Sequence, residues 1–131
     1  MAIYSRKFTV PPDTEREFSI SLDGDVITYV RIRYPPGPCG LLRIAFFYGP
    51  KQIFPYEEET WFYGDDEIIE WQEYYEVPER PMPLTIKAIN DDDTYEHSFY
   101  VVINVQDKKY LLAQQLANSI ARALRRLLGF V

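Results

Sequence analysis

The chain contains 131 residues, 47% of them hydrophobic and 26% charged, which fits a single globular domain with one core. Its only cysteine, Cys39, excludes a framework of internal disulfide bonds. No segment reaches the roughly 18 uncharged apolar residues that suggest a membrane-spanning helix. Residues 2–7 contain no apolar run of the kind found in signal peptides. We therefore expect neither a secretory signal nor a helical membrane protein.

Charge is distributed unevenly along the chain. The net charge is −6, yet residues 107–131 carry a balance of +4, so the first 106 residues carry −10. An acidic surface repels phosphate groups, and we expect no nucleic acid on this acidic body. Only the C-terminal segment has the charge to contact an anionic partner.

The composition favours β-strands separated by turns. Aromatic residues make up 16% of the chain, which also contains ten prolines and six glycines. Residues 18–22 and 26–34 alternate apolar and polar side chains, the period of a half-buried strand. Because Asp23-Gly24-Asp25 lies between them, we expect these two strands to form a hairpin.

Further strands are expected before residue 107. Residues 41–48 are apolar except at Arg43, which indicates a central strand covered on both faces. Residues 55–66 are acidic and aromatic without a clear period, and we interpret them as a long loop. Three prolines, Pro78, Pro81 and Pro83, should interrupt strand pairing. The remaining strand candidates are residues 4–10, 52–54, 67–71, 74–77, 84–89 and 99–105.

These strands predict an all-β fold. About eight strands at a spacing of roughly 8–12 residues are typical of a sandwich or barrel. We predict an eight-stranded antiparallel sandwich of the jelly-roll type, with an immunoglobulin-like sandwich as the alternative. The sandwich domain would comprise residues 1–106, and residues 107–131 would form one amphipathic α-helix.

The C-terminal segment is the only long stretch with helical periodicity. Its apolar side chains recur at alternating spacings of four and three among good helix formers. Asp107 is expected at the N-cap or as a first-turn acid, and Gly129 should end the helix. The residues that we expect to contact another copy or a partner are Ala113, Leu116, Ala117, Ile120, Leu124, Leu127 and Val131.

Three interpretations of this helix remain open. Packed against copies of itself or a partner, it gives a coiled-coil seam of roughly three heptads, which needs an attached oligomeric body for stability. Docked on its own sandwich, it covers a sheet. Laid on a membrane, it places arginines on the polar face and leucines with Phe130 on the other. We favour contact with another molecule.

The chain is poor in the residues that enzymes use. His97 is its only histidine, so a catalytic dyad or a histidine metal site would depend on it alone, and a surface or strand-start position is the simpler interpretation. Neither a Gly-rich phosphate loop nor a nucleophile elbow is present. We predict a non-enzymatic protein without a cofactor.

Two acidic turns, residues 65–66 and 91–93, are the candidates for calcium, because hard cations take several oxygen ligands. Neither turn has the spacing of an EF-hand, and consecutive aspartates are typical of a solvated turn. We predict no bound metal and leave calcium as the alternative.

An aromatic stretch could bind a glycan by stacking. Six candidate rings lie within residues 61–75, and we single out Trp61, Tyr63, Trp71 and Tyr74 as possible stacking residues. The competing interpretation is that these rings fill the core or a subunit contact, since Tyr and Trp are common in both.

Three turn-rich stretches, residues 34–42, 48–55 and 90–97, are similar to uncharacterised proteins of viral origin. With its cysteine-poor sandwich and terminal assembly element, the chain resembles small virion-associated proteins of tailed phages and archaeal viruses, such as decoration proteins and head or tail accessory proteins. The resemblance implies a jelly-roll module within residues 4–105 and carries over no functional residue.

We therefore predict a structural protein that forms a homo-oligomer or lattice, or contacts a capsid protein, through exposed aromatic surfaces and the C-terminal helix. A virion or the cytoplasm is the expected location. The alternatives are a carbohydrate-binding module and peripheral membrane association through the helix.

Overall fold

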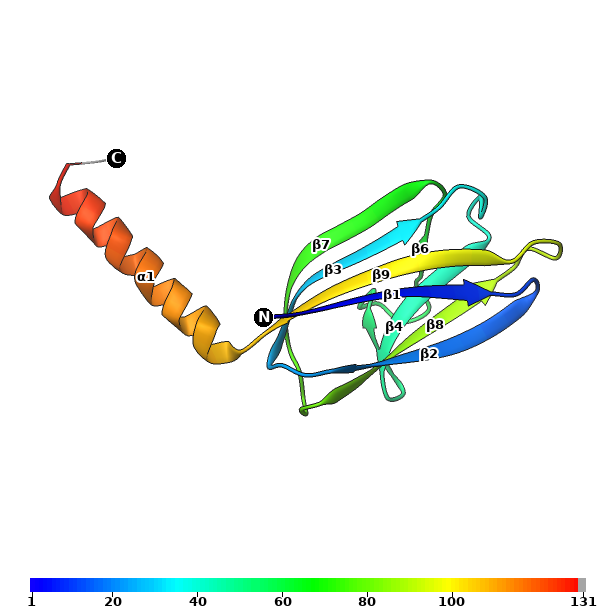
Figure 1. Cartoon of the computed structure of the whole chain (residues 1–131), viewed down its shortest axis with the longest axis horizontal. Coiled ribbons are helices and arrows are strands. Elements are labelled where there is room, and N and C mark those ends of the chain that lie inside the picture. Colours follow the sequence, from blue (N-terminus) through cyan, green and yellow to red (C-terminus); the bar gives the residue numbers. More distant parts are fainter. Residues whose placement is uncertain (130–131) are drawn as a thin grey trace.

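The computed structural model describes residues 1–129 as a β-sandwich that carries a helix at its C-terminal end (Figure 1). The strands are β1 (Ala2–Val10), β2 (Thr14–Leu22), β3 (Val26–Tyr34), β4 (Leu42–Tyr48), β5 (Lys51–Phe54), β6 (Phe62–Tyr63), β7 (Glu67–Glu76), β8 (Met82–Asn90) and β9 (His97–Gln106), and the helix is α1 (Lys108–Leu127).

The strands pair as if one long hairpin had been folded over on itself. β1 pairs with β9, β2 with β8 and β3 with β7, while β4 pairs with both β5 and β6, all antiparallel. The two sheets have the orders β1-β9-β3-β7 and β2-β8-β4-β5, with β6 beside β4. This nested order is that of an eight-stranded jelly roll in which β5 and β6 share one position. The predicted jelly-roll sandwich with one C-terminal helix is confirmed.

The core lies between the two sheets. Alternate residues of β8 and β9 are buried, as the period of residues 84–89 and 99–105 predicted. β4 buries three successive residues, Ile44, Ala45 and Phe46. This central strand is therefore covered on both faces over these residues, as its continuous apolar run predicted.

The Asp23-Gly24-Asp25 connection does not form the predicted hairpin. β2 and β3 belong to different sheets, so the chain crosses here from one layer to the other. A Cβ atom at Gly24 would lie 2.2 Å from Cγ1 of Val105, and the crossing therefore requires a residue without a side chain. The Asp-Gly signal locates a turn but does not distinguish a hairpin from a crossing.

Three further details differ from the sequence prediction. Residues 67–76 form one continuous strand, β7, rather than two. The predicted loop of residues 55–66 contains the short strand β6, which pairs with β4. Pro83 lies within β8, where it is tolerated because β4 pairs with β8 only from Thr85 onward. Pro83 therefore has a strand neighbour on one side alone.

α1 projects from the end of the sandwich where β9 finishes (Figure 1). None of its residues from Lys108 to Leu127 is buried, so the interpretation in which the helix covers its own sheet is wrong. Gly129, with a φ of 76°, follows the C-cap and ends the helix as predicted. Within residues 1–129, no helix is both long enough and apolar enough to cross a membrane.

Candidate functional site

A cluster of charges joins α1 to the sandwich. Asp107 occupies the N-cap position but makes no capping bond, and its carboxylate instead contacts the guanidinium of Arg80 at 2.9 Å. Arg80 also contacts Asp23 at 2.7 Å and Asp25 at 3.4 Å. The capping role belongs to Asp25, whose carboxylate accepts the backbone N–H of Lys108 at 2.9 Å. The first turn of the helix is thus held by the crossing between β2 and β3.

The contacts at this junction favour the charged forms of Asp25 and Lys108. The N–H donated by Lys108 is the main cause that lowers the pKa of the Asp25 carboxyl, and Arg80 adds to the effect. The side chain of Lys108 contacts Glu76 of β7 at 3.0 Å, and this bond raises the pKa of the lysine. These contacts fix the direction in which α1 leaves the sandwich.

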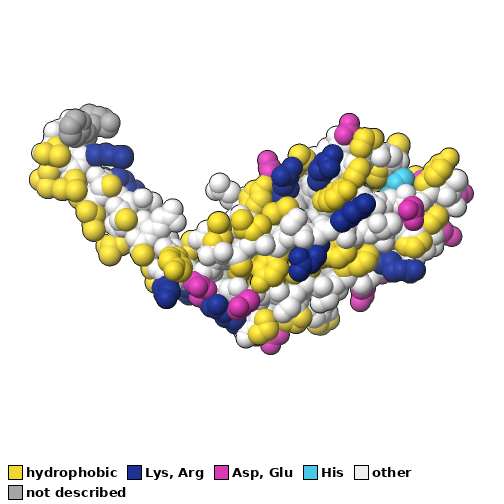
Figure 2. Space-filling model, viewed as in Figure 1, with side chains coloured by type: hydrophobic (Ala, Val, Ile, Leu, Met, Phe, Trp, Pro, Cys, Tyr) yellow, Lys and Arg dark blue, Asp and Glu magenta, His cyan; other side chains and the backbone are white. Residues whose placement is uncertain are grey.

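One side of α1 carries an apolar stripe that the sandwich does not cover (Figure 2). Leu116, Ile120 and Leu124 are 63%, 53% and 52% exposed. The predicted contact residues on this stripe are Ala113, Leu116, Ala117, Ile120, Leu124 and Leu127, while the predicted Val131 lies outside the described residues. Leu112, which the sequence prediction did not include, extends the stripe toward the sandwich and is also exposed.

The basic side chains near the end of α1 lie away from this stripe. With about 3.6 residues per turn, Arg122, Arg125 and Arg126 fall on the opposite side of the helix. Figure 2 shows basic side chains near the end of α1 on the side away from the apolar stripe. Two of them occupy the last turn, where a positive charge suits the helix dipole. Another molecule can therefore cover the stripe without burying an arginine.

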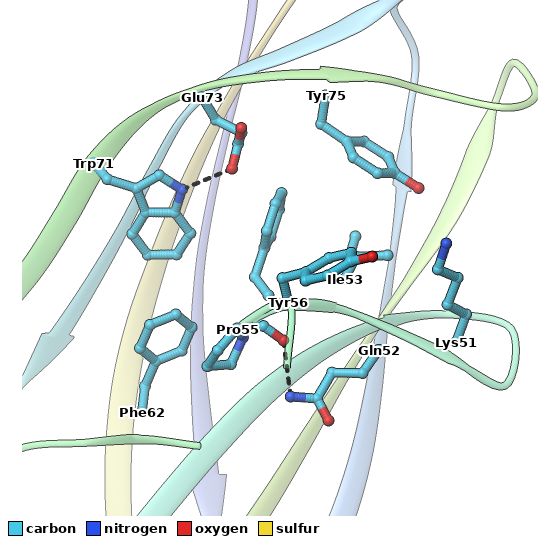
Figure 3. A pocket seen from close by; sticks show the side chains of 10 residues that line it. Lys51, Gln52, Ile53, Pro55, Tyr56, Phe62, Trp71, Glu73 and Tyr75 are labelled. Carbon is cyan, nitrogen blue, oxygen red and sulfur yellow. Dashed lines mark hydrogen bonds between the residues drawn. The ribbon is translucent and has the colours of Figure 1, made fainter. Parts of the chain in front are cut away.

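An aromatic pocket of about 540 Å³ opens between β5 and β7, the edge strands of the two sheets (Figure 3). Phe54 meets Trp71 and Tyr75 edge to face, at interplanar angles of 77° and 73°. Phe62 stacks on Trp71 with the ring centroids 5.1 Å apart. We call the three rings Phe54, Trp71 and Tyr75 the aromatic box.

A buried glutamine shapes one side of this pocket. The side-chain amide of Gln52 is 6% exposed and donates to three backbone carbonyls of the loop that follows β5. These acceptors are the carbonyl oxygens of Pro55, Glu57 and Thr60, at 2.9, 3.1 and 2.8 Å. Because these bonds hold the loop, Tyr56 is placed at the pocket although its side chain is 82% exposed.

The four predicted stacking residues do not come together. Trp71 lines the pocket, whereas Tyr74 lies on the opposite face of β7 and is 53% exposed. Trp61 instead lies beside Arg43, whose guanidinium carbon is 5.1 Å from the ring centroid, and Tyr63 is exposed on β6. Only Trp71 belongs to the aromatic box, and glycan stacking by these residues stays a prediction.

The sequence prediction divided residues 67–77 into two strands and therefore did not identify the side of β7 that faces the pocket. In one continuous strand, Trp71, Glu73 and Tyr75 share a face because side chains alternate. Phe54 and Gln52, at the short β5 strand, carried no signal of their own. The regular spacing of Ile69, Trp71 and Tyr75, interrupted only by Glu73, was the signal that could have revealed this face.

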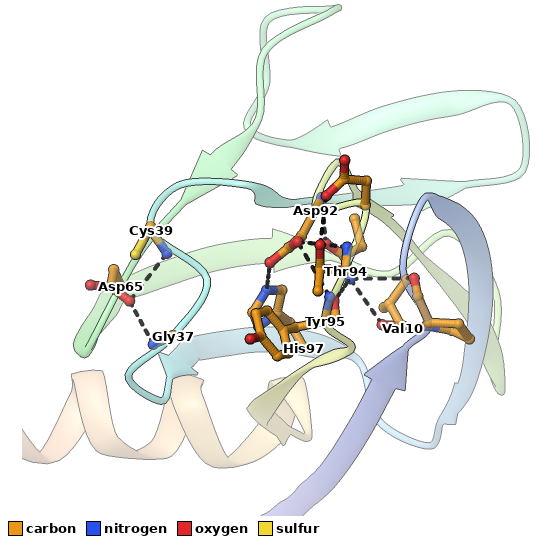
Figure 4. A network of polar contacts seen from close by, with 11 residues as sticks. Val10, Gly37, Cys39, Asp65, Asp92, Thr94, Tyr95 and His97 are labelled. Carbon is orange, nitrogen blue, oxygen red and sulfur yellow. Dashed lines mark hydrogen bonds and ion pairs between the residues drawn. The ribbon is translucent and has the colours of Figure 1, made fainter.

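His97 and the aspartate turn form a local hydrogen-bond network (Figure 4). The carboxylate of Asp92 accepts the backbone N–H groups of Thr94 and Tyr95 at 2.9 and 3.3 Å, and it contacts Nε2 of His97 at 2.7 Å. The N–H of Thr94, followed by the bond to His97, lowers the pKa of the Asp92 carboxyl. His97 begins β9 as predicted but is buried at 8% exposure, so the surface part of that prediction is wrong.

The second acidic turn, residues 65–66, also makes hydrogen bonds that hold the fold together. Asp65 accepts the backbone N–H groups of Gly37 and Cys39 at 2.8 and 3.2 Å, which ties the β3–β4 loop to the segment before β7 (Figure 4). Within residues 1–129, no three acidic, histidine or cysteine side chains converge as metal ligands do. These carboxylates therefore have structural partners, and calcium binding remains only the alternative stated above.

No known protein family matches the chain, and no curated protein matches its sequence. Among solved structures, it is similar to a de novo designed double-stranded β-helix, with 19% identity, a TM-score of 0.40, and coverage of 77% of this chain and 99% of that one. It is also similar to a periplasmic inhibitor of g-type lysozyme from Aeromonas hydrophila, with 9% identity, a TM-score of 0.45, and coverage of 78% and 84%.

A third similar structure is that of Bacillus endospore appendages, described as disulfide-linked pili, with 12% identity, a TM-score of 0.42, and coverage of 77% of this chain and 85% of that one. All of these likenesses are distant, and the jelly-roll assignment rests on the strand order of the chain itself. The resemblance to virion-associated proteins holds for the fold, and its viral part stays a prediction.

Proposed function

We propose that this chain is a structural protein whose copies assemble through α1 into a homo-oligomer or lattice. The observation that carries the proposal is the apolar stripe, which remains exposed from Leu112 to Leu127 although the helix base is held to the sandwich. Contiguous apolar surface of this kind is typical of an interaction site.

A second copy of the same helix fits the stripe. The alternating spacing of four and three is that of a coiled-coil seam. Ala113 and Ala117 allow close approach of two helices in the half of α1 nearer the sandwich, and Arg122, Arg125 and Arg126 would stay in solvent on the outside. Self-association therefore covers the leucines without bringing arginines face to face.

The length of α1 bears on the form of the assembly. Full burial of one leucine or isoleucine contributes about 1.5–3 kcal/mol, while association costs roughly 4–15 kcal/mol in lost freedom of motion. Two helices of 20 residues bury their seam only partly. We therefore expect three or more helices to pack together, or the sandwiches to add contacts of their own.

The virion is the proposed setting, because the jelly-roll module and terminal assembly element are what the resemblance to virion-associated proteins rests on. A role without catalysis fits the use of His97 and Asp92, which bond to each other and to the backbone of their own turn. A capsid protein is the partner to test first after the chain itself.

Deletion of residues 107–131 tests the proposal. Because α1 buries no residue, we expect the remaining chain to keep its β-sheet circular dichroism while losing the assembled state in sedimentation and light scattering. An oligomer of unchanged size after the deletion would contradict assembly through the helix.

Peripheral membrane binding uses the same surface and is the alternative that the separated arginines favour. It predicts that the full chain co-sediments with anionic vesicles and that added salt weakens this binding. Absence of co-sedimentation would eliminate this alternative and leave self-assembly in place.

Carbohydrate binding is the alternative that the pocket at Trp71 favours. A glycan array comparing the wild type with Tyr56→Ala tests it, and Trp61→Ala serves as the control because Trp61 does not line the pocket. Glycan binding predicts a signal that Tyr56→Ala weakens and Trp61→Ala retains.

A further inference from the structure

We propose that the aromatic box binds an organic cation, of the quaternary ammonium or methylated amine class, with Glu73 as its counter-charge. The box is formed by Phe54, Trp71 and Tyr75 between β5 and β7 (Figure 3), and no residue of α1 lines the pocket. The inference concerns a second site and does not depend on assembly through the helix.

The three rings line one pocket, and Phe54 packs edge to face against the other two. Trp71 and Tyr75 stand at 77° and 73° to Phe54, with centroid separations of 5.5 and 5.7 Å. The face of an aromatic ring attracts a cation that lies within about 6 Å of its centroid. A compact cation in the pocket would therefore meet aromatic rings in its lining.

A carboxylate completes the site. Glu73 projects from the same face of β7 as Trp71 and Tyr75 (Figure 3). One of its oxygens accepts the indole N–H of Trp71 at 3.2 Å, and the other accepts the backbone N–H of Tyr74 at 3.0 Å. Glu73 forms no ion pair with any other residue in 1–129. A half-buried carboxylate without a basic partner favours a positively charged ligand.

The remaining charges near the pocket are compatible with a cation. Lys51, the only basic residue among those that line it, is exposed and lies at the end of the pocket away from Trp71 (Figure 3). The first 106 residues carry a charge of −10, which raises the local concentration of cations near the sandwich.

The arrangement favours a compact cation over a sugar. A sugar ring is recognised by a ring face together with several polar groups that bond its hydroxyls. Here the rings cross steeply, and Gln52 already uses its amide N–H groups on the loop carbonyls. Glu73 is the one carboxylate that lines the pocket.

The experiment compares choline with 3,3-dimethyl-1-butanol, a neutral molecule of the same shape. The chain has two tryptophans, so a Trp61→Phe background leaves Trp71 as the only indole fluorophore. We expect choline to change the fluorescence of Trp71 saturably and the neutral isostere to bind roughly tenfold more weakly. Calorimetry with the wild type checks that the fluorescence reports binding.

Two variants locate the site. Glu73→Gln keeps the shape of the side chain and removes its charge, although the amide has one acceptor oxygen for the two N–H groups that Glu73 accepts. It should weaken choline binding by roughly three- to tenfold. Tyr56→Ala removes a largely exposed ring at the pocket and should weaken it about twofold. Glu70→Gln is the matched control, because this substitution removes the same charge from the outward face of β7. Circular dichroism verifies that each variant is folded.

Four results would overturn the inference. One is the absence of a saturable response to choline up to about 20 mM, a concentration at which even weak, millimolar binding would be detected. Two others are equal binding of the neutral isostere and unchanged binding by folded Glu73→Gln. Binding of a sugar without binding of choline would also overturn it and would support the glycan alternative for this pocket.

Discussion

The β-sandwich and α1 place their apolar side chains in opposite environments. In the sandwich, nested pairing brings the two sheets together and side chains such as Leu84 and Phe99 are fully buried. In α1, an equally regular apolar pattern stays exposed, with Leu124 at 52% and Leu127 at 83%. Periodicity therefore shows which side of an element is apolar, whereas only the three-dimensional structure shows whether the same chain covers it.

The boundary between the two regions is structured rather than loose. One residue, Asp107, separates β9 from α1, and the first helical N–H is capped by Asp25 from the β2–β3 crossing. The exposed helix thus leaves the sandwich in a defined direction, which a symmetric assembly requires of each copy.

The same substitution made in each region gives the largest expected contrast. Leu84→Ala removes a fully buried side chain and should lower the free energy of unfolding by about 2–5 kcal/mol. Leu124→Ala should change it by less than about 0.5 kcal/mol in dilute, unassembled protein. Urea unfolding followed by tryptophan fluorescence measures both. A comparable loss in both variants under these conditions would mean that α1 packs on its own sandwich.

The β2–β3 crossing offers a smaller but more local test. Gly24→Ala would place a methyl group 2.2 Å from Cγ1 of Val105, and such overpacking costs about 1–3 kcal/mol. In a Val105→Ala background the clash disappears, so the added cost of Gly24→Ala should shrink. Equal costs in both backgrounds, measured by the same urea unfolding, would show that the close approach is absent.

The smallest expected effect concerns the helix cap and pH. The folded state lowers the pKa of Asp25 below its usual 3.8, so its contribution is present above that value and is lost as the pH falls through the lowered pKa. We expect hydrogen exchange of the Lys108 N–H, corrected for intrinsic rates, to lose protection over this range while the amides of β9 keep theirs.

Asp25→Asn is the control for this titration. The variant should show weaker protection of the Lys108 N–H at neutral pH. This protection should not change over the pH range in which Asp25 titrates in the wild type. Protection that follows the same acid profile in the variant and the wild type would assign the effect to another group.

Much of the fold was predictable because half-buried strands carry a strict period of two. Residues 26–34, 84–89 and 99–105 alternate clearly, and each forms a strand whose inner side chains reach the core. The partners of the strands were harder to predict. Asp23-Gly24-Asp25 has the composition of a hairpin turn, yet it crosses between sheets, since pairing is decided by residues distant in sequence.

The candidate sites were predictable to different degrees. The stripe of α1 depends on local helical spacing, and Leu116, Ile120 and Leu124 lie along it as the sequence indicates. The aromatic box depends on the meeting of two sheet edges, Phe54 from β5 with Trp71 and Tyr75 from β7. No local sequence pattern predicts contacts between residues so far apart in the chain. The capping of α1 by Asp25 could not be predicted for the same reason.

Sedimentation velocity of two single-charge variants tests the central claim most directly. Leu116→Asp places a carboxylate on the apolar stripe, whereas Asn118→Asp adds the same charge on the opposite side of α1. The wild type and Asn118→Asp should sediment as the same oligomer, and Leu116→Asp should sediment as a smaller species. A wild type that remains monomeric at high concentration, or two variants that behave alike, would contradict assembly through the helix.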